Sequence, residues 1–596
     1  MTVTLLETPV PPPAIEELDP TLPVQSQPLT VETLLWVLVG GAALLFRLLD
    51  IARWPLSERE AALALETWHF VAGQPYEMNV GGMPLSPLAF NLSALLFALF
   101  GASDAAARVA QALGGTALML SPWLLRPFLG RGHALAVSML LLLSPSSLFF
   151  SRHASGEVWA ALCAMGLIAG VAHWLRAPSD RSGMLVALAL GLGLASSPAF
   201  WSVLVAGALL GLWRWRQERE TFADTLRLPE ASSRTRYGAV AGAAFLISTT
   251  GFFTNLQGLG AAFALPVEWA SSLLGGGPEL ALPFLFVLLM YEILPLLTAL
   301  VGSSLLIGEH PQWTRFLLLW TAVTVVPATL ANSGWTAGIF FAALPLALLG
   351  GAVVVRIARQ VVEEGSWQID GFAVLVALGL LIYFWLNLAA YLSMAVQPNP
   401  HPMAWATSIR LFMAVGLFIA GAVALNLTYG AGTQRRVLGL TLLLLFSIIS
   451  LSSAWGLSFT RGGNPREPLV TEPSRTDLRT GAAQLEQISI ERYRKPHAIP
   501  LGIQRTLGYA PRWYFRNFEN VTLVEGSYAT LPEAALLDEE ADAPPERIGQ
   551  RVWSSSQWQR PSPLSTAAMF QWLTTREEST GYIGRAVTLY VTLPQQ

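Results

Sequence analysis

Long apolar runs constrain the fold of this chain more than any other feature. A helix needs about twenty apolar residues to cross a bilayer, and such runs recur between residues 32 and 456. Charged residues make up 13% of the 596 residues and hydrophobic residues 53%, whereas soluble domains carry roughly 25% charged residues. The sequence therefore predicts a mainly α-helical protein that spans a membrane many times.

We place about thirteen transmembrane helices in this region. Their predicted ranges are 32–50, 104–125, 132–150, 156–176, 183–197, 199–213, 238–254, 280–306, 313–331, 336–356, 370–392, 407–427 and 437–456. The ambiguous segment is 84–101. If it does not cross, the loop arginines fall on the inner side, as the positive-inside rule requires. We therefore expect the N-terminus in the cytoplasm and the C-terminus outside the plasma membrane.

The two ends of the chain differ from this membrane domain, 32–456. Residues 1–31 are rich in proline, acidic and free of lysine and arginine, which predicts a disordered cytoplasmic tail. Residues 457–596 are polar and contain short strand-like runs such as "NVTLVEG" and "AVTLYVTL", which predict a small α/β domain outside the membrane. The single cysteine, Cys163, excludes disulfides within the chain. The net charge of -3 gives no attraction for nucleic acid.

The first outer loop, 51–103, contains "WPLSEREAALALETWHFVAG" and predicts amphipathic helices. Ser57 and Glu60 have the spacing of a capping box, in which each side chain bonds the backbone N–H of the other. On that interpretation, replacing Glu60 by glutamine changes stability by less than about 1 kcal/mol. The alternative is that Glu58 and Glu60 take part in chemistry, with Arg59 lowering the pKa of Glu60. Both interpretations remain open from the sequence.

A second polar stretch, 144–162, places Arg152, His153 and Glu157 on the same predicted outer face. Ionisable groups at the end of a span usually anchor it at the interface. Two carboxylates from separate loops, Glu60 and Glu157, could instead hold a divalent cation, Mg²⁺ or Mn²⁺, or supply a general base beside an anion-binding arginine.

Three further residues lie at unusual places in the apolar sequence. Tyr291 and Glu292 fall inside a predicted span, where a carboxylate costs several kcal/mol unless it is paired or faces a cavity. Trp335 follows an outer loop and is either an aromatic anchor or part of a binding site. The seven histidines show no pair with metal-ligand spacing on one helix.

These stretches, in this order, resemble the GT-C glycosyltransferase superfamily, which includes protein O-mannosyltransferases, aminoarabinose transferases and oligosaccharyltransferase catalytic subunits. The resemblance rests on "RLLDIARWPLSEREAALALETW", "PLSPLAFNLSALLFALFGASDAAARVAQALGG" and "LLRPFLGRGHALAVSMLLLLSPSSLFFSR". The later "VLLMYEILPLL", "ALPLALLGG" and "APRWYFRNFENVTLVEG" look most like the branch named for an archaeal flippase-activity-associated protein. The likeness covers nearly the whole chain after residue 32.

The resemblance implies a GT-C fold and transfer of a sugar from a polyprenyl-phosphate donor to a lipid, glycan or protein acceptor. It also implies an Asp-Glu pair in the first outer loop, at the positions of Arg59 and Glu60. Arginine is always protonated and has no acceptor, so Arg59 can be neither base nor metal ligand. Glu157 stands where the family has aspartate, whereas Arg152, Tyr291 and Glu292 match.

Two functions follow from this resemblance. The first is a membrane glycosyltransferase in which Glu58, Glu60 and Glu157 are the catalytic candidates. Arg59, Arg152, His153, Tyr291, Glu292 and Trp335 would then bind the substrate. The second is a catalytically silent relative that binds a lipid-linked sugar or a partner and assists glycan assembly or flipping. A transporter is less well supported, because the two halves of the chain show no repeated hydropathy pattern.

Overall fold

The computed structural model describes residues 30–217, 219, 229–274, 283–331, 333–395, 403–465, 467–471, 473–525, 531–541, 544, 546–558 and 582–592. Most of the predicted tail, 1–29, lies outside this part of the chain. The helices of the membrane domain are α1 (Val31–Leu48), α2 (Glu58–Val71), α3 (Pro87–Phe100), α4 (Asp104–Leu120), α5 (Arg126–Leu129), α6 (Arg131–Leu143), α7 (Pro145–Phe150), α8 (Glu157–Arg176), α9 (Asp180–Leu194), α10 (Phe200–Gln217), α12 (Ala231–Thr250), α13 (Gln257–Leu273), α14 (Phe284–Tyr291), α15 (Ile293–Glu309), α16 (Pro311–Leu330), α17 (Thr336–Glu364), α18 (Trp367–Ala395) and α19 (Met403–Trp455).

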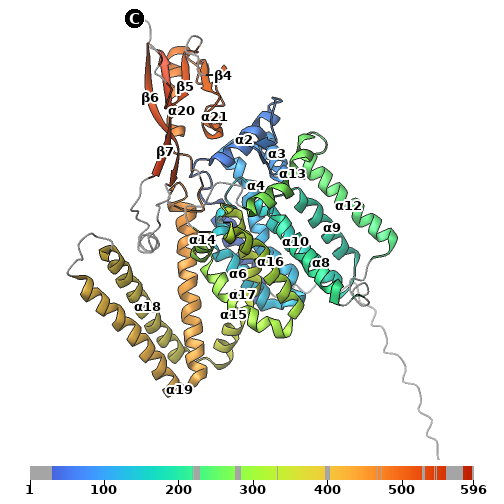
Figure 1. Cartoon of the computed structure of the whole chain (residues 1–596), viewed down its shortest axis with the longest axis vertical. Coiled ribbons are helices and arrows are strands. Elements are labelled where there is room, and N and C mark those ends of the chain that lie inside the picture. The colour runs from blue at the N-terminus through green and yellow to red at the C-terminus, as the bar shows by residue number, and fades with distance from the viewer. Residues whose placement is uncertain are drawn as a thin grey trace, which may run out of the picture.

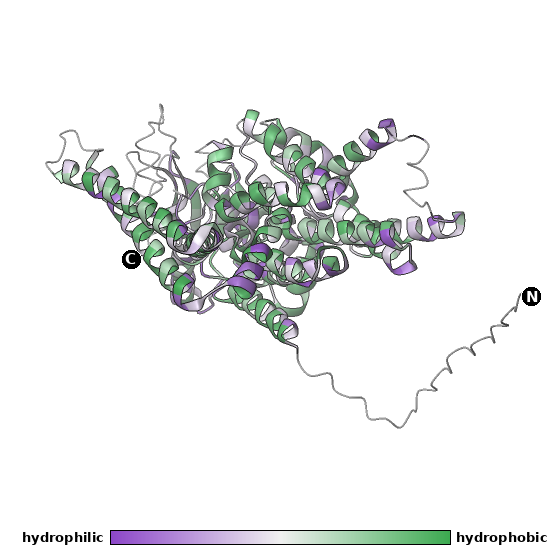
Figure 2. Cartoon of the chain, turned by 90° about the horizontal axis from the view of Figure 1, so that it is seen from below, coloured by the Kyte–Doolittle hydropathy of each residue, from purple (hydrophilic) through white to green (hydrophobic). Residues whose placement is uncertain are grey.

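The molecule is a helical bundle with a small sheet domain at one end (Figure 1). Helix α17 lies at the centre, and most of its first half is buried because its apolar residues surround the whole helix. Helices α18 and α19 pack against each other at one side of the bundle and expose many large apolar side chains. Figure 2 shows hydrophobic residues along most of the helices and hydrophilic residues mainly near their ends. The chain is a multi-pass membrane protein.

The structure does not confirm the predicted number of about thirteen membrane spans. Among the described residues, six helices are long and apolar enough to cross a membrane, and seven if one bent pair counts as a span. Helix α3, in the ambiguous segment 84–101, has only 14 residues, or about 21 Å at 1.5 Å per residue, and is not among them. The helix α6 is equally absent from these six, so length does not decide whether 84–101 crosses, and its non-spanning position stays a prediction.

Two predicted spans break where the sequence did not indicate it. The range 280–306 is not one helix, because α14 and α15 meet at Glu292 with a bend of 92°. The range 132–150 divides into α6 and α7, because Ser144 ends one helix and caps the next, whose first residue is Pro145. Two other predicted breaks are present: α9 and α10 are separated at 195–199, and α19 is interrupted at Gly430. Gly430 has φ 87°, a conformation that favours glycine.

The C-terminal domain, 457–596, is an α/β domain, as predicted. It contains the helices α20 (Asp477–Tyr493) and α21 (Tyr509–Tyr514) and the strands β3 (Leu501–Gln504), β4 (Val521–Val524), β5 (Ala534–Asp538), β6 (Arg547–Trp558) and β7 (Tyr582–Thr592). The sheet order is β4-β3-β5-β7-β6, with β3 parallel to β4 and β5, and β7 antiparallel to β5 and β6. The two quoted strand-like runs correspond to β4 and β7.

This domain shares a hydrophobic core with the first outer loop. Leu65 of α2 and Phe97 of α3 belong to the same buried cluster as Leu485 and Trp513 of the C-terminal domain. The rings of Phe97 and Trp513 stack with their centroids 5.9 Å apart. At the opposite end of the bundle, Arg436 pairs with the α17–α18 turn. The C-terminal domain therefore packs on the loop that bears the predicted site, away from that turn.

Candidate active site

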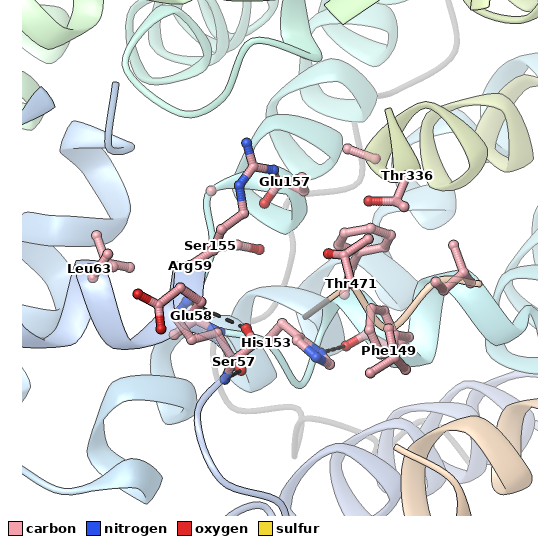
Figure 3. A pocket seen from close by; sticks show the side chains of 18 of the residues that line it. Ser57, Glu58, Arg59, Leu63, Phe149, His153, Ser155, Glu157, Thr336 and Thr471 are labelled. Atoms are coloured by element: carbon pink, nitrogen blue, oxygen red, sulfur yellow. Dashed lines mark hydrogen bonds between the residues drawn. The ribbon is translucent and has the colours of Figure 1, made fainter. Parts of the chain in front are cut away.

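A pocket of about 370 Å³ lies where the membrane domain meets the C-terminal domain. It is lined by the start of α2, the short hairpin of β1 (Asn79–Val80) and β2 (Met83–Pro84), and the loop between α7 and α8. Further walls come from α13, the start of α17, and the π-helical turn Gly456–Thr460 with the segment after it. Seven of the nine predicted site residues line this pocket, and Figure 3 shows Glu58, Arg59, His153 and Glu157 around it.

The capping box predicted at the start of α2 is present. The Ser57 side chain accepts from the Glu60 backbone N–H, and the Glu60 side chain accepts from the Ser57 backbone N–H. Three consecutive charged residues then point to three different partners, because neighbouring helical positions are about 100° apart. Glu58 contacts the C-terminal domain, Arg59 reaches the pocket hairpin, and Glu60 turns inward. Capping is therefore only part of the function of this turn.

Glu60 forms a buried ion pair that the sequence did not indicate. Its Oε1 accepts from Arg108 Nε at 2.7 Å and from the Ala154 N–H at 2.9 Å. Its Oε2 accepts from Arg108 Nη2 at 2.7 Å and from the Ser57 N–H and hydroxyl at 2.9 and 3.1 Å. The two side chains are only 3% and 4% exposed. A carboxylate has about four lone-pair sites, so Glu60 has none left for a proton or a metal.

Arg108 uses all five of its N–H groups in this contact. Two go to Glu60, and three go to the carbonyls of Ile51, Trp54 and Pro55. Because these carbonyls precede α2 and Arg108 belongs to α4, the guanidinium fixes the first outer loop to the bundle. The signal in the sequence is weak: Arg108 is a single arginine in an alanine-rich helix, 48 residues from its partner.

The electrostatics of Glu60 follow from this pair. Burial by itself raises the pKa of the carboxyl, but Arg108, then His153, and the hydrogen bonds lower it to about 2. The expectation that Arg59 provides this effect is wrong, since Arg59 is not among the causes. Arg59 is exposed, and its guanidinium donates to the Met83 sulfur, a weak acceptor.

Glu58 connects the first outer loop to the C-terminal domain. Its carboxylate accepts from the backbone N–H groups of Tyr509 and Ala510, at the start of α21, with the second contact at 3.0 Å. A Cβ atom at Gly508 would lie 2.2 Å from Glu58 Oε1, so only glycine allows this approach. These contacts give Glu58 a structural role, and its predicted catalytic role remains a prediction.

Arg152 and His153 follow α7 and are both engaged. Arg152 donates to the carbonyls of Phe46, Arg47, Leu49 and Asp50, in the last turn of α1 and directly after it. Arg152 therefore caps a helix, and its predicted role in holding a phosphate remains untested. His153 Nδ1 lies 2.8 Å from the Phe149 carbonyl oxygen, and its ring packs against that of Phe149 with the centroids 3.7 Å apart and the planes tilted by 37°. Burial lowers the pKa of His153.

Glu157 is a lining carboxylate with an unused acceptor. It is the first residue of α8, and its Oε2 is buried without a hydrogen-bond partner among the described residues. Glu268 of α13 also lines the pocket, and sequence analysis missed it because it lies alone in an apolar helix. Trp335 lines the pocket directly before α17, and its predicted role in binding stays a prediction.

Tyr291 and Glu292 do not line the pocket, and their predicted role in substrate binding stays a prediction. The Tyr291 hydroxyl donates to the buried Glu467. Glu292 is fully buried, and its Oε1 accepts from the Ser144 hydroxyl at 2.8 Å and from the Ser146 N–H at 3.0 Å. Glu292 stabilises the break between α14 and α15 by joining it to the start of α7.

The side chains also decide how well the predicted metal site fits. Among the described residues, no group of three or more histidine, cysteine, aspartate or glutamate side chains could hold a metal ion. Glu60 offers no lone pair, and the positive charge of Arg108 repels a cation. The predicted Mg²⁺ or Mn²⁺ between Glu60 and Glu157 does not fit these contacts.

Known proteins support the same architecture. No family model and no curated protein matches the sequence. The crystal structure of apo ArnT from Cupriavidus metallidurans superposes with a TM-score of 0.54 at 15% identity, covering 95% of this chain and 100% of ArnT. The structure of ArnT bound to undecaprenyl phosphate gives 0.53 at 15% identity, covering 94% and 99%. The chain has the GT-C fold. This confirms the predicted fold class, because the GT-C likeness extends through both the bundle and the C-terminal domain.

Proposed function

We propose that this GT-C protein is a membrane glycosyltransferase. It would transfer a sugar from a polyprenyl-phosphate-linked donor to a lipid, glycan or protein acceptor at the extracytoplasmic face of the plasma membrane. The observation that carries the proposal is the pocket between the bundle and the C-terminal domain, which combines an exposed arginine with carboxylates and an aromatic side chain. One of the similar structures is an ArnT complex with undecaprenyl phosphate, the carrier that such a donor would contain.

The pocket residues suit each part of such a donor. Arg59 would bind the phosphate, because its guanidinium matches phosphate geometry and its present acceptor is only a thioether sulfur. Glu157 and Glu268 would accept hydrogen bonds from sugar hydroxyls, and Trp335 would offer an apolar surface to the ring. The acceptor oxygen would attack the anomeric carbon and the polyprenyl phosphate would leave. Phosphate is a good leaving group, so no general acid is required.

The orientation rests on the arginine distribution in the loops. If α3 lies at the outer surface, the loop arginines fall on the cytoplasmic side. The pocket, the first outer loop and the C-terminal domain would then face outward, with the N-terminus in the cytoplasm.

A second candidate function is a silent relative that binds a lipid-linked sugar or a partner without transfer. The observation that favours it is that every acceptor site of the Glu60 carboxylate is already occupied. The carboxylate that occupies the acidic position of the family is bound by five donors and cannot act as a base without breaking its ion pair.

The experiment uses water as the acceptor, so that the natural acceptor need not be known. Purified protein is incubated in detergent with undecaprenyl-phosphate-linked hexoses and pentoses, and release of undecaprenyl phosphate is measured. Arg59→Ala should raise KM for the donor by about 10- to 100-fold, the equivalent of a charge-assisted hydrogen bond. Arg53→Ala is the matched control, because Arg53 pairs with Asp50 at the surface, where both side chains are 49% exposed. Binding of the donors without cleavage by the wild type would favour the silent relative.

A further inference from the structure

We infer that His153 is the general base of the proposed transfer reaction, accepting the proton of the attacking hydroxyl on its Nε2 atom. This inference rests on the proposed function. Neither residue at the positions of the family's acidic pair can act as the base. Arg59 has no atom that accepts a proton, and both carboxylate oxygens of Glu60 are bound by donors. The base must therefore come from another side chain of the pocket.

The hydrogen bond to Phe149 fixes the proton on the ring of His153. A carbonyl oxygen accepts only, so Nδ1, 2.8 Å from the Phe149 oxygen, must carry the hydrogen. In the neutral ring, Nε2 then has the lone pair. No hydrogen bond joins Nε2 to another group of the described chain, and His153 lines the same pocket as Glu157. The contact with the Phe149 ring holds the imidazole in this orientation.

The charges around the ring suit a base that is neutral at physiological pH. Glu60 from α2 favours the protonated ring, whereas Arg108 from α4 and Arg152 from the same loop oppose it. Burial has the largest effect and lowers the pKa of His153 from its ordinary 6.5. Burial therefore favours the unprotonated ring that a general base needs. The carboxylate of Glu60 then lies near the imidazolium that forms, much as an acidic residue stabilises a catalytic histidine elsewhere.

Glu157 is the other candidate base in the pocket. The hydrogen bond to Phe149 fixes the tautomer of His153, with the lone pair on Nε2, whereas no hydrogen bond among the described residues orients the Glu157 Oε2 atom. We therefore assign proton transfer to His153 and sugar binding to Glu157. In the balanced step the acceptor O–H bond breaks, its proton goes to Nε2 and the oxygen bonds to the anomeric carbon. The bond from that carbon to the phosphate oxygen breaks, and its electron pair leaves with the phosphate. The histidine then releases the proton to solvent.

His153→Asn tests this assignment, because the asparagine amide can keep the hydrogen bond to Phe149 but has no atom in place of Nε2. We expect donor cleavage to fall about 100-fold or more in kcat, with little change in KM. The acid limb of the pH–rate profile, which reports protonation of the base, should disappear. Added imidazole should restore part of the activity of His153→Ala, an effect that a structural histidine does not produce.

The matched control is His173→Asn at the far end of α8, where the histidine ring contacts the Leu124 carbonyl. It should leave kcat and the pH profile unchanged. Binding of undecaprenyl phosphate and thermal unfolding of each variant separate loss of chemistry from loss of folding. An active wild type with a fully active His153→Asn would overturn the role of His153 and leave the proposed function intact. A wild type that binds donor but never cleaves it would overturn both.

Discussion

The ion pair between Glu60 and Arg108 makes the first prediction. Every hydrogen-bond partner of the Glu60 carboxylate is a donor. In Glu60→Gln, the amide nitrogen, itself a donor, would replace one carboxylate oxygen in either orientation of the amide. Its nitrogen would face Arg108 together with either the Ala154 N–H or the Ser57 N–H. The substitution also leaves the buried guanidinium of Arg108 without its counter-charge.

Two independent estimates give the loss of unfolding free energy that Glu60→Gln should cause. A shift in the pKa of Glu60 from 4.5 to about 2 corresponds to roughly 3 kcal/mol, at about 1.4 kcal/mol per pH unit. Removing one partner of a buried ion pair costs about 3–5 kcal/mol. Loss of the capping interaction alone would lower the stability by less than about 1 kcal/mol. The ion pair with Arg108 therefore makes the expected loss of stability several times larger.

The assay is thermal unfolding in detergent, followed by tryptophan fluorescence. Glu66→Gln is the matched control on the same helix. Glu66 is also buried, but its Oε2 accepts one backbone N–H, from Glu77 at 2.8 Å, and among the described residues its only salt-bridge partner is the ring of His69 at 3.6 Å, so glutamine can keep the hydrogen bond. The double variant Glu60→Leu/Arg108→Met should be less destabilised than the sum of its two single variants, because it removes both charges together. If Glu60→Gln unfolds at the same temperature as Glu66→Gln, the reasoning about this ion pair is wrong.

Three other predictions concern the same region. The stability that the lowered pKa of Glu60 provides is present above pH 4.5 and is lost as the pH falls from 4.5 toward about 2, so Glu60→Gln should flatten the dependence of unfolding on pH in that window. Gly508→Ala places a Cβ atom 2.2 Å from Glu58 Oε1 and should loosen the C-terminal domain, which limited proteolysis would detect as faster release; unchanged digestion would contradict this. Asp104→Asn weakens the acceptor for three side chains of the C-terminal domain and should also speed its release, whereas a slower digestion would show that the charge is unfavourable there.

Local sequence determined the membrane character and many element boundaries. The capping box from Ser57 to Glu60 could be predicted because its partners are three residues apart and need no tertiary contact. The strands β4 and β7 could be predicted from short runs rich in β-branched residues, and the break at Gly430 from the gap between two apolar runs. The order of motifs also pointed to the GT-C fold, which the ArnT structures support.

Tertiary structure alone decided what the charged residues do. Glu58 accepts from the backbone N–H groups of Tyr509 and Ala510, which are 451 and 452 residues away in the chain. Glu60 pairs with Arg108, which is 48 residues away. Glu292 lies at a helix break because the Ser144 and Ser146 donors of α7 meet it there. A buried charge must be paired or hydrogen-bonded, so its role depends on whichever donor or counter-charge the fold brings within about 3 Å. Sequence spacing cannot specify that partner, because the fold and not the chain order sets which side chains share a low-dielectric interior.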